Sequence, residues 1–125
     1  GLGDVYKRQS VYVSDEARMM ARFKNYYFRL GNVNENSYQE MFNGELLHHI
    51  ISFACTECLP ACSDCVFQPY CGADPVRNMS EQGDMVGFRP TNEMCKKTKS
   101  IIHYLFELLH KHDPEINRIF WSWLN

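Results

Sequence analysis

Cysteine is the residue whose number and spacing give this chain of 125 residues its potential chemistry. Five of the six cysteines fall within residues 55–71 and the sixth follows after a loop: Cys55, Cys58, Cys62, Cys65, Cys71 and Cys95. Thiolates at this density bind soft metals and iron–sulfur clusters, or pair as disulfides in exported proteins. The sequence shows no basic segment followed by an apolar stretch and a small-residue cleavage site. We therefore expect a cytoplasmic protein whose cysteines bind metal.

Two possible uses of these cysteines are structural. A disulfide scaffold would need an oxidising compartment, which the lack of an export signal does not favour. A zinc site would use the pairs Cys55-x2-Cys58 and Cys62-x2-Cys65, but only three residues separate the two pairs. Paired zinc knuckles usually stand about a dozen or more residues apart. A cytosolic zinc-binding interaction module therefore stays as the alternative interpretation.

A third use is suggested by Cys58-x3-Cys62-x2-Cys65, which matches the C-x3-C-x2-C motif of a radical S-adenosylmethionine (SAM) core. In that motif three thiolates leave one iron open for SAM. The motif opens a large α/β barrel, whereas this chain of 125 residues continues for only 60 after Cys65. Asp64 also stands where an aromatic side chain is usual. We therefore do not expect an active SAM-binding core here.

The fourth use is an auxiliary [4Fe–4S] cluster with four protein thiolates, and it is the one that we expect. Cys62-x2-Cys65-x5-Cys71 and the distant Cys95 supply the four ligands. The close triplet allows one loop to wrap three corners of a cube. Cys95 falls in the first turn of a predicted helix, where the helix dipole stabilises a thiolate.

The elements around the cysteines are predicted from periodicity and from helix-cap residues. A helix over residues 45–54 leads the chain to Cys55. Residues 55–90 show no periodicity and are broken by proline and glycine, so ligand bonds are expected to hold this long irregular stretch. A long amphipathic helix is predicted from its N-cap Thr91 to about residue 111, and a further helix from Asp113-Pro114.

The N-terminal part predicts a small β-ribbon and a short helix. Strands are expected at residues 11–13 and 26–30, and a helix at 38–42 with Ser37 or Asn36 as its cap. The resulting fold class is α+β: a short N-terminal β-ribbon, an irregular cysteine-rich loop and C-terminal helices. We divide the chain into residues 10–54, 55–95 and 96–125. Residues 1–9 resemble a translated sequencing adapter, so we expect the natural chain to begin earlier.

Composition excludes two classes of partner. With a formal net charge of −2, the chain lacks the excess of basic residues that is typical of nucleic-acid-binding proteins. The sequence contains no run of about 18 apolar residues, so no membrane span is predicted. Apolar residues make up 45% of the chain and aromatic residues 14%, which can support a core.

Three stretches together resemble a known family. They are Cys62-Ser-Asp-Cys65-Val-Phe-Gln-Pro-Tyr-Cys71-Gly-Ala-Asp-Pro75, then Gln82-Gly83-Asp84, then Arg89-Pro90-Thr91-Asn92-x-x-Cys95. This pattern resembles the C-terminal SPASM-type region of radical SAM peptide maturases. The nearest likeness is to the six-cysteine His-Xaa-Ser system radical SAM maturase. The resemblance covers roughly residues 11–109, and its cysteine portion is the specific part.

The resemblance implies a function that the residues alone do not show. Enzymes of this kind modify ribosomally made peptides, and their SPASM region holds auxiliary clusters that pass electrons or help to bind the peptide. It implies that Cys62, Cys65, Cys71 and Cys95 ligate a [4Fe–4S] cluster. The implied partners are the N-terminal radical SAM barrel of the same enzyme and a precursor peptide. SAM would bind only in that barrel, so the fragment alone is not expected to be active.

The sequence departs from the family pattern at several positions. Asp74 stands where a cysteine is expected, and its carboxylate is either an iron ligand or an ordinary loop carboxylate. Cys55 matches the pattern and Cys58 is extra; both either contribute to a second metal centre or are simple buried thiols. Ser14 and Asn36 lie near positions where a two-cluster region would carry cysteines, which argues against a complete second cluster.

Other polar residues are expected to have structural or surface roles. His103 and His110 lie seven residues apart and can share a helix face, but we expect surface roles for the histidines. Arg77, Arg89 and Asp84 lie in the cysteine-rich part, where they either brace loops or contact a bound peptide.

Overall fold

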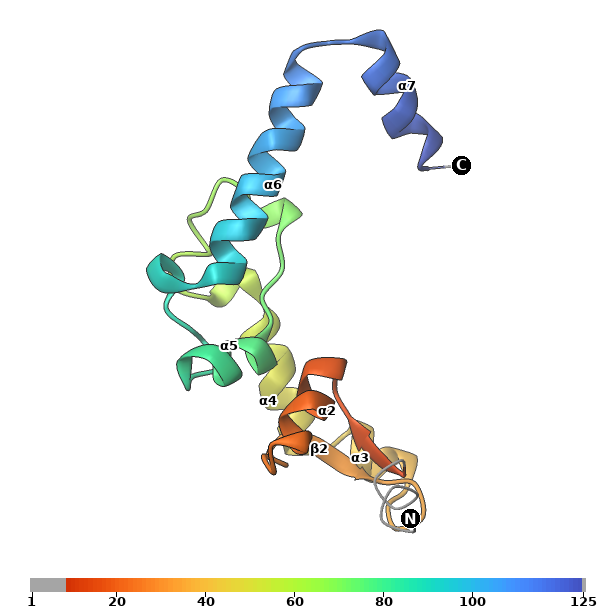
Figure 1. The fold of residues 1–125 in the computed structure, drawn as a ribbon. Coiled ribbons are helices and arrows are strands. Elements are labelled where there is room, and N and C mark those ends of the chain that lie inside the picture. The colour runs from red at the N-terminus through yellow and green to blue at the C-terminus, as the bar shows by residue number, and fades with distance from the viewer. Residues whose placement is uncertain (1–8, 125) are drawn as a thin grey trace.

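A computed structural model describes residues 9–124 and shows an elongated molecule built mainly of helices (Figure 1). The main elements are β1 (Ser10–Tyr12), α2 (Asp15–Arg22), β2 (Arg29–Asn32), α3 (Tyr38–Phe42), α4 (Glu45–Ala54), α5 (Pro75–Gln82), α6 (Glu93–His110) and α7 (Pro114–Ser122). Single 3₁₀ turns form at η1 (Thr56–Cys58), η2 (Gln68–Tyr70) and η3 (Arg89–Thr91). The predicted fold class is confirmed. The adapter-like segment lies outside the described residues apart from Gln9, whose carbonyl accepts the Val33 amide at 3.0 Å.

The β-ribbon joins β1 and β2 antiparallel, with Val11 opposite Gly31. The second strand was wrongly predicted at residues 26–30, since β2 begins at Arg29 and includes Gly31. A turn closed by the Arg29 amide on the Tyr26 carbonyl precedes it, and Phe28 enters the core at 1% exposure. A Cβ on Gly31 would lie 2.7 Å from the Asn36 side-chain oxygen. Glycine therefore permits the close approach of the loop after β2.

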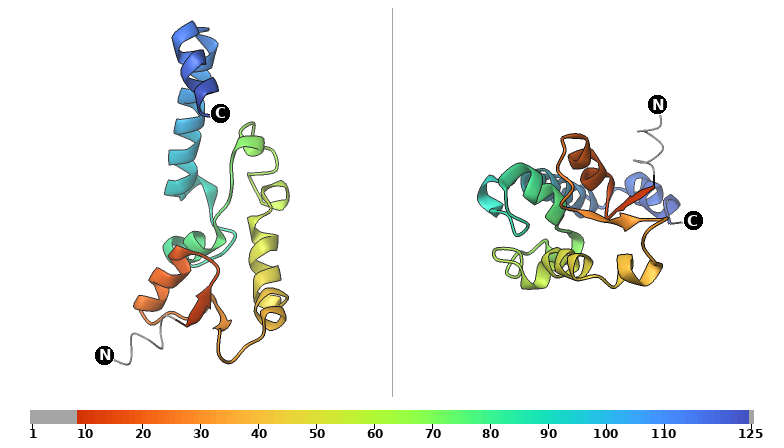
Figure 2. Two further views of the ribbon diagram at one scale, coloured as in Figure 1. Left: turned by 90° about the vertical axis from the view of Figure 1, so that its right-hand side faces the viewer. Right: turned by 90° about the horizontal axis from the view of Figure 1, so that it is seen from below.

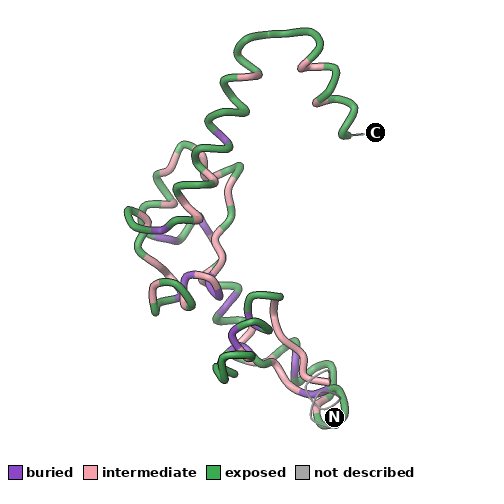
Figure 3. The backbone as a smooth tube through the Cα atoms, viewed as in Figure 1, coloured by how far each residue is buried: buried purple, intermediate pink, exposed green. Residues whose placement is uncertain are grey.

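The hydrophobic core lies where α2, α4 and α5 meet the ribbon. Its buried members are Ala17, Met20, Phe28, Ile50, Val76 and Met85. Buried residues gather in this body, and few occur along α6 and α7 (Figure 3). Helix α5 packs against both α2 and α4, so it connects the cysteine-rich segment to the core.

Helix α5 is an element that the sequence prediction missed, because residues 55–90 were expected to be irregular throughout. It begins with Asp74 as N-cap, whose Oδ1 accepts the Arg77 amide at 3.0 Å, and with Pro75 in its first turn. It ends at Gly83, which has a left-handed φ of 74°. Eight residues are too few to show a clear apolar period. The Asp-Pro start was nevertheless the same signal that correctly predicts α7 after Asp113.

Helix α3 was predicted correctly, and Ser37 is the cap used. The Glu40 amide donates to Ser37 Oγ at 3.3 Å, and the Ser37 amide donates to Glu40 Oε2 at 2.7 Å. We expect Ser37→Ala to lower the free energy of unfolding by about 1 kcal/mol, because the Glu40 amide loses its Ser37 Oγ acceptor while the backbone amide of residue 37 can still donate to Glu40. Urea denaturation measures this. The exposed Ser80→Ala is the control and should stay within about 0.5 kcal/mol; an equal loss in both variants would contradict the assignment.

Helix α6 extends away from the body (Figure 2), and the view of Figure 1 shows α7 lying apart from the outer half of α6. In α6 only Ile102 is buried, and α7 has no buried residue. Large apolar side chains remain exposed on this pair of helices: Ile101, Tyr104, Leu105, Phe106, Leu109, Ile119, Trp121 and Trp123. Among residues 9–124, no helix combines the length and the apolar character that crossing a bilayer requires.

Candidate metal centre

The cysteine-rich segment between α4 and α5 is a series of tight turns. The Cys62 amide donates to the Leu59 carbonyl at 3.1 Å, and the Cys65 amide donates to the Cys62 carbonyl at 3.0 Å. Cys62 and Cys65 therefore stand on consecutive turns of the same loop. Leu59, at 4% exposure, anchors the start of this loop. The fold thus gives the first two predicted ligands a defined backbone.

Ala61 adopts a left-handed backbone conformation with φ of 60°, immediately before Cys62. For a residue with a Cβ this conformation costs about 1–2 kcal/mol. Strain of this kind persists where the surroundings hold it in place, and it is concentrated at functional sites. The strained backbone at Ala61 therefore makes the turn that carries Cys62 and Cys65 a candidate functional segment.

Two side-chain contacts connect the loop to the rest of the molecule. Gln68 Nε2 donates to Oγ1 of the buried Thr56 at 3.0 Å, which links η2 back to η1. The ring of Tyr70 meets the ring of Phe106 edge to face, with centroids 5.1 Å apart. This second contact brings the segment just before Cys71 against α6, the helix that carries Cys95.

Cys95 is positioned by the N-cap of α6. Asn92 Oδ1 accepts the Cys95 amide at 2.8 Å, so Asn92 is the cap. Thr91 was wrongly predicted in this role, because it belongs to η3 and its Oγ1 instead accepts Gln82 Nε2 at 3.1 Å. An asparagine three residues before Cys95 was the available signal. The cap holds Cys95 on the first turn of α6, as predicted.

A buried amide network behind Asn92 fixes this helix start. Asn92 Nδ2 donates to Asn78 Oδ1 at 2.9 Å, and Asn78 Nδ2 donates to the carbonyls of Met85 at 3.0 Å and Val86 at 3.2 Å. Asn78 is 1% and Asn92 is 2% exposed. Gly87 permits the packing, since a Cβ there would lie 2.9 Å from Asn78 Cγ. No local sequence pattern predicts these bonds, which join residues far apart along the chain.

The pKa of Cys71 responds to the other three predicted ligands. Burial raises the pKa of the Cys71 thiol, a backbone hydrogen bond at Gly72 opposes this, and the charges of Cys95, Cys62 and Cys65 raise the pKa further. These three residues are the other predicted ligands, and all four thiols are half-buried. The charge of Cys95 therefore acts on Cys71, although 23 residues lie between them in the sequence.

The donor set has the chemistry that the predicted cluster needs. In a [4Fe–4S] cluster each thiolate binds a different iron, and the four predicted ligands are half-buried free thiols. Within residues 9–124, no three His, Cys, Asp or Glu side chains lie close enough to share a single metal ion. The ligand assignment stays a prediction.

Cys55 and Cys58 form a separate pair at the end of α4. Their sulfur atoms are 3.5 Å apart, and the Cys55 thiol donates to Glu57 Oε2 at 3.3 Å. The hydrogen bond with Glu57, followed by that with Cys58, raises the pKa of Cys55. Cys58 is exposed and Cys55 is half-buried. The interpretation of both as buried thiols is therefore wrong for Cys58, because the turn of η1 leaves it at the surface.

The charged residues of the cysteine-rich part brace local structure. Asp74 caps α5, and this role accounts for its position without testing iron ligation. Arg77 pairs with Glu81 at 2.6 Å, and Asp84 Oδ1 accepts the Val86 amide at 3.0 Å. Arg89 Nη2 donates to the Val86 carbonyl at 2.6 Å, while its buried Nε has no partner among the described residues. Loop bracing, one of the two expected roles, is thus present for Asp84 and Arg89, whereas the Arg77 ion pair lies within α5.

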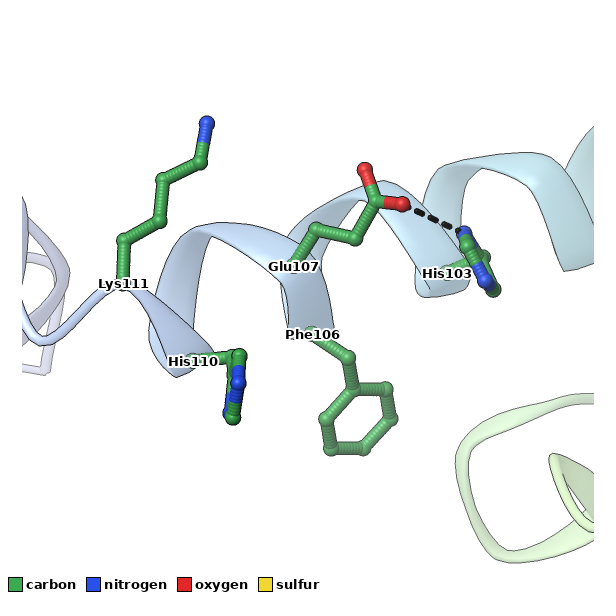
Figure 4. A pocket seen from close by; sticks show the side chains of 5 residues that line it. All are labelled: His103, Phe106, Glu107, His110 and Lys111. Atoms are coloured by element: carbon green, nitrogen blue, oxygen red, sulfur yellow. Dashed lines mark ion pairs between the residues drawn. The ribbon is translucent and has the colours of Figure 1, made fainter.

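The predicted shared face of His103 and His110 forms a shallow pocket along the outer half of α6. Phe106, Glu107 and Lys111 complete its lining (Figure 4). His103 Nδ1 lies 3.4 Å from Glu107 Oε1, and both side chains are more than half exposed. Exposed ion pairs of this kind contribute little to stability. The arrangement agrees with the surface role expected for these histidines.

Comparison with known proteins gives no assignment. No family model matches the chain, no curated protein matches it, and no solved structure matches it.

Proposed function

We propose that this chain binds an auxiliary [4Fe–4S] cluster in a radical SAM enzyme that modifies a ribosomally made peptide. Cys62, Cys65, Cys71 and Cys95 are the proposed ligands. The observation that carries the proposal is the placement of Cys95 on the first turn of α6, the helix whose Phe106 packs against Tyr70 just before Cys71. A spacing that supplies three thiolates from one loop needs a fourth from elsewhere, and Cys95 is the proposed fourth.

The strained turn before Cys62 supports the same proposal. Iron–thiolate bonds would offset the cost of about 1–2 kcal/mol for the left-handed Ala61. Metal binding commonly supplies folding free energy to segments that lack a core of their own. The cluster would supply electron transfer, while the chain's own contribution is to hold the thiolates and to fix the helix start at Asn92.

The enzyme context rests on the resemblance in residues 62–95 to SPASM-type regions. In this proposal SAM binds to a radical SAM barrel of the same enzyme, and a precursor peptide is the substrate. The exposed apolar side chains of α6 and α7 are the proposed contact with the barrel.

A zinc-binding interaction module is the second candidate. The observation that favours it is the distance of 3.5 Å between the sulfurs of Cys55 and Cys58. Two thiolates on a tetrahedral zinc, each with a bond of about 2.3 Å, stand about 3.8 Å apart. The short separation between the two C-x2-C pairs remains the argument against it.

Anaerobic reconstitution of the chain with iron and sulfide decides between these functions. We expect a brown protein with a broad visible iron–sulfur absorbance and about four irons per chain. Protein purified from cells grown in zinc-containing medium should hold little zinc before it is reconstituted. A colourless protein that retains zinc and takes up no iron would overturn the proposed function in favour of the alternative.

A further inference from the structure

The pair formed by Cys55 and Cys58 has the geometry of a reversible disulfide. Their sulfur atoms are 3.5 Å apart, and a disulfide bond is about 2.05 Å long. The Cys58 amide donates to the Cys55 carbonyl at 3.1 Å, so the backbone turn is already closed. The two sulfur atoms must therefore approach by about 1.5 Å to form the bond.

The pair is also accessible and separate from the proposed cluster ligands. Cys58 is exposed to solvent, whereas the four proposed ligands are all half-buried. The pair ends α4, and the buried Thr56 between the two cysteines connects it to Gln68. In the cytoplasm, disulfides are usually transient and have catalytic or redox-sensing roles. A C-x2-C pair at the surface suits such a role.

We propose that Cys55 and Cys58 form a dithiol–disulfide pair that exchanges with small disulfides such as oxidised glutathione. The proposal does not depend on the cluster, because neither cysteine belongs to the proposed ligand set. The oxidised pair would cross-link the end of α4 to η1 and restrain the start of the cysteine-rich loop.

Exchange proceeds in two steps that balance. In the first, the Cys58 thiol loses its proton to solvent and its sulfur attacks one sulfur of the small disulfide. That S–S bond breaks, a mixed disulfide forms on Cys58, and the other half leaves as a thiolate. Cys58 is the thiol that reacts first, because it is exposed to solvent. The thiol of Cys55 is instead half-buried and engaged in a hydrogen bond to Glu57.

In the second step, the Cys55 sulfur attacks Cys58 Sγ as its proton passes to the Glu57 carboxylate, which already accepts that hydrogen bond at 3.3 Å. The protein disulfide forms, the bond to the second half breaks, and that half takes up the proton from Glu57 and leaves as a thiol, while the first half is protonated by solvent. The two protein thiols lose two electrons, and the small disulfide is reduced to two thiols. Glu57 is thus a positioning residue for the resolving thiol.

The test is oxidation of the full chain in glutathione buffers of graded potential, followed by acid quenching, alkylation and peptide mass mapping. We expect a protein disulfide between Cys55 and Cys58, formed reversibly with the loss of two hydrogens. Cys55→Ser should stop the reaction at a mixed disulfide on Cys58, and Cys58→Ser should give no product at this pair. Glu57→Gln should slow closure of the disulfide about tenfold or more without slowing the first step.

Two outcomes would overturn the proposal. Oxidation that joins either residue to Cys62, Cys65, Cys71 or Cys95 would show that the pair is not a unit. Protection of both thiols from alkylation until a chelator removes zinc would show a metal site instead. Iron content, measured on the same samples, reports on the cluster separately, so either proposal can fail alone.

Discussion

Replacing Cys65 with alanine is expected to abolish cluster uptake, whereas replacing Cys58 should leave it nearly complete. After anaerobic reconstitution, iron in Cys65→Ala should fall from about four per chain to below one. The visible iron–sulfur absorbance should fall with it. The physical reason is that each thiolate of a [4Fe–4S] cluster binds a different iron, so the variant leaves one corner of the cluster without its ligand.

Cys58→Ala is the matched control because it removes a thiol from the same segment. Cys58 is exposed and contacts Cys55, and it is not among the charges that act on Cys71. Equal loss of iron in both variants would show that the ligand set is wrong. Full iron content in Cys65→Ala would exclude Cys65 as a ligand and would favour a set that includes Cys55 or Cys58.

Local signals were sufficient for most of the helical elements. Helix α4 was predicted with its observed bounds, because an apolar face follows directly after a glycine at the N-cap. Helix α7 was found from Asp113-Pro114, and α3 from its serine cap. Such signals act within one turn of the chain, so a single sequence contains all the information that they need.

Features that depend on distant partners were not predictable in the same way. Phe28 looks like part of a strand locally, but it is drawn into the core among side chains from α2, α4 and α5. The link between Asn78 and Asn92 spans 14 residues and depends on the position of α5, which was itself missed. The cysteine spacing predicts a set of four ligands, and both their gathering around one cluster and their binding of iron stay predictions.

The start of α6 provides the second large effect, because one side chain there both caps the helix and closes a buried network. Asn92→Ala should lower the free energy of unfolding by about 3 kcal/mol. The lost cap accounts for about 1 kcal/mol of this. The remainder arises because Asn78 Oδ1 loses its donor in a buried position. Urea denaturation of the iron-free chain, followed by far-ultraviolet circular dichroism, measures the change.

Two further variants separate the cap from the network and from the rejected cap at Thr91. Thr91→Ala removes only exposed hydrogen bonds and should cost less than about 1 kcal/mol. Asn92→Asp retains an acceptor for the Cys95 amide but removes the donor to Asn78, so its stability should lie between those of Asn92→Ala and the unaltered chain. A larger loss of unfolding free energy in Thr91→Ala than in Asn92→Ala would show that Thr91 is the N-cap of α6 after all. In that case Cys95 would no longer be held on the first turn of α6 by the bond from Asn92, and the approach of Cys95 to Cys71 would need another cause.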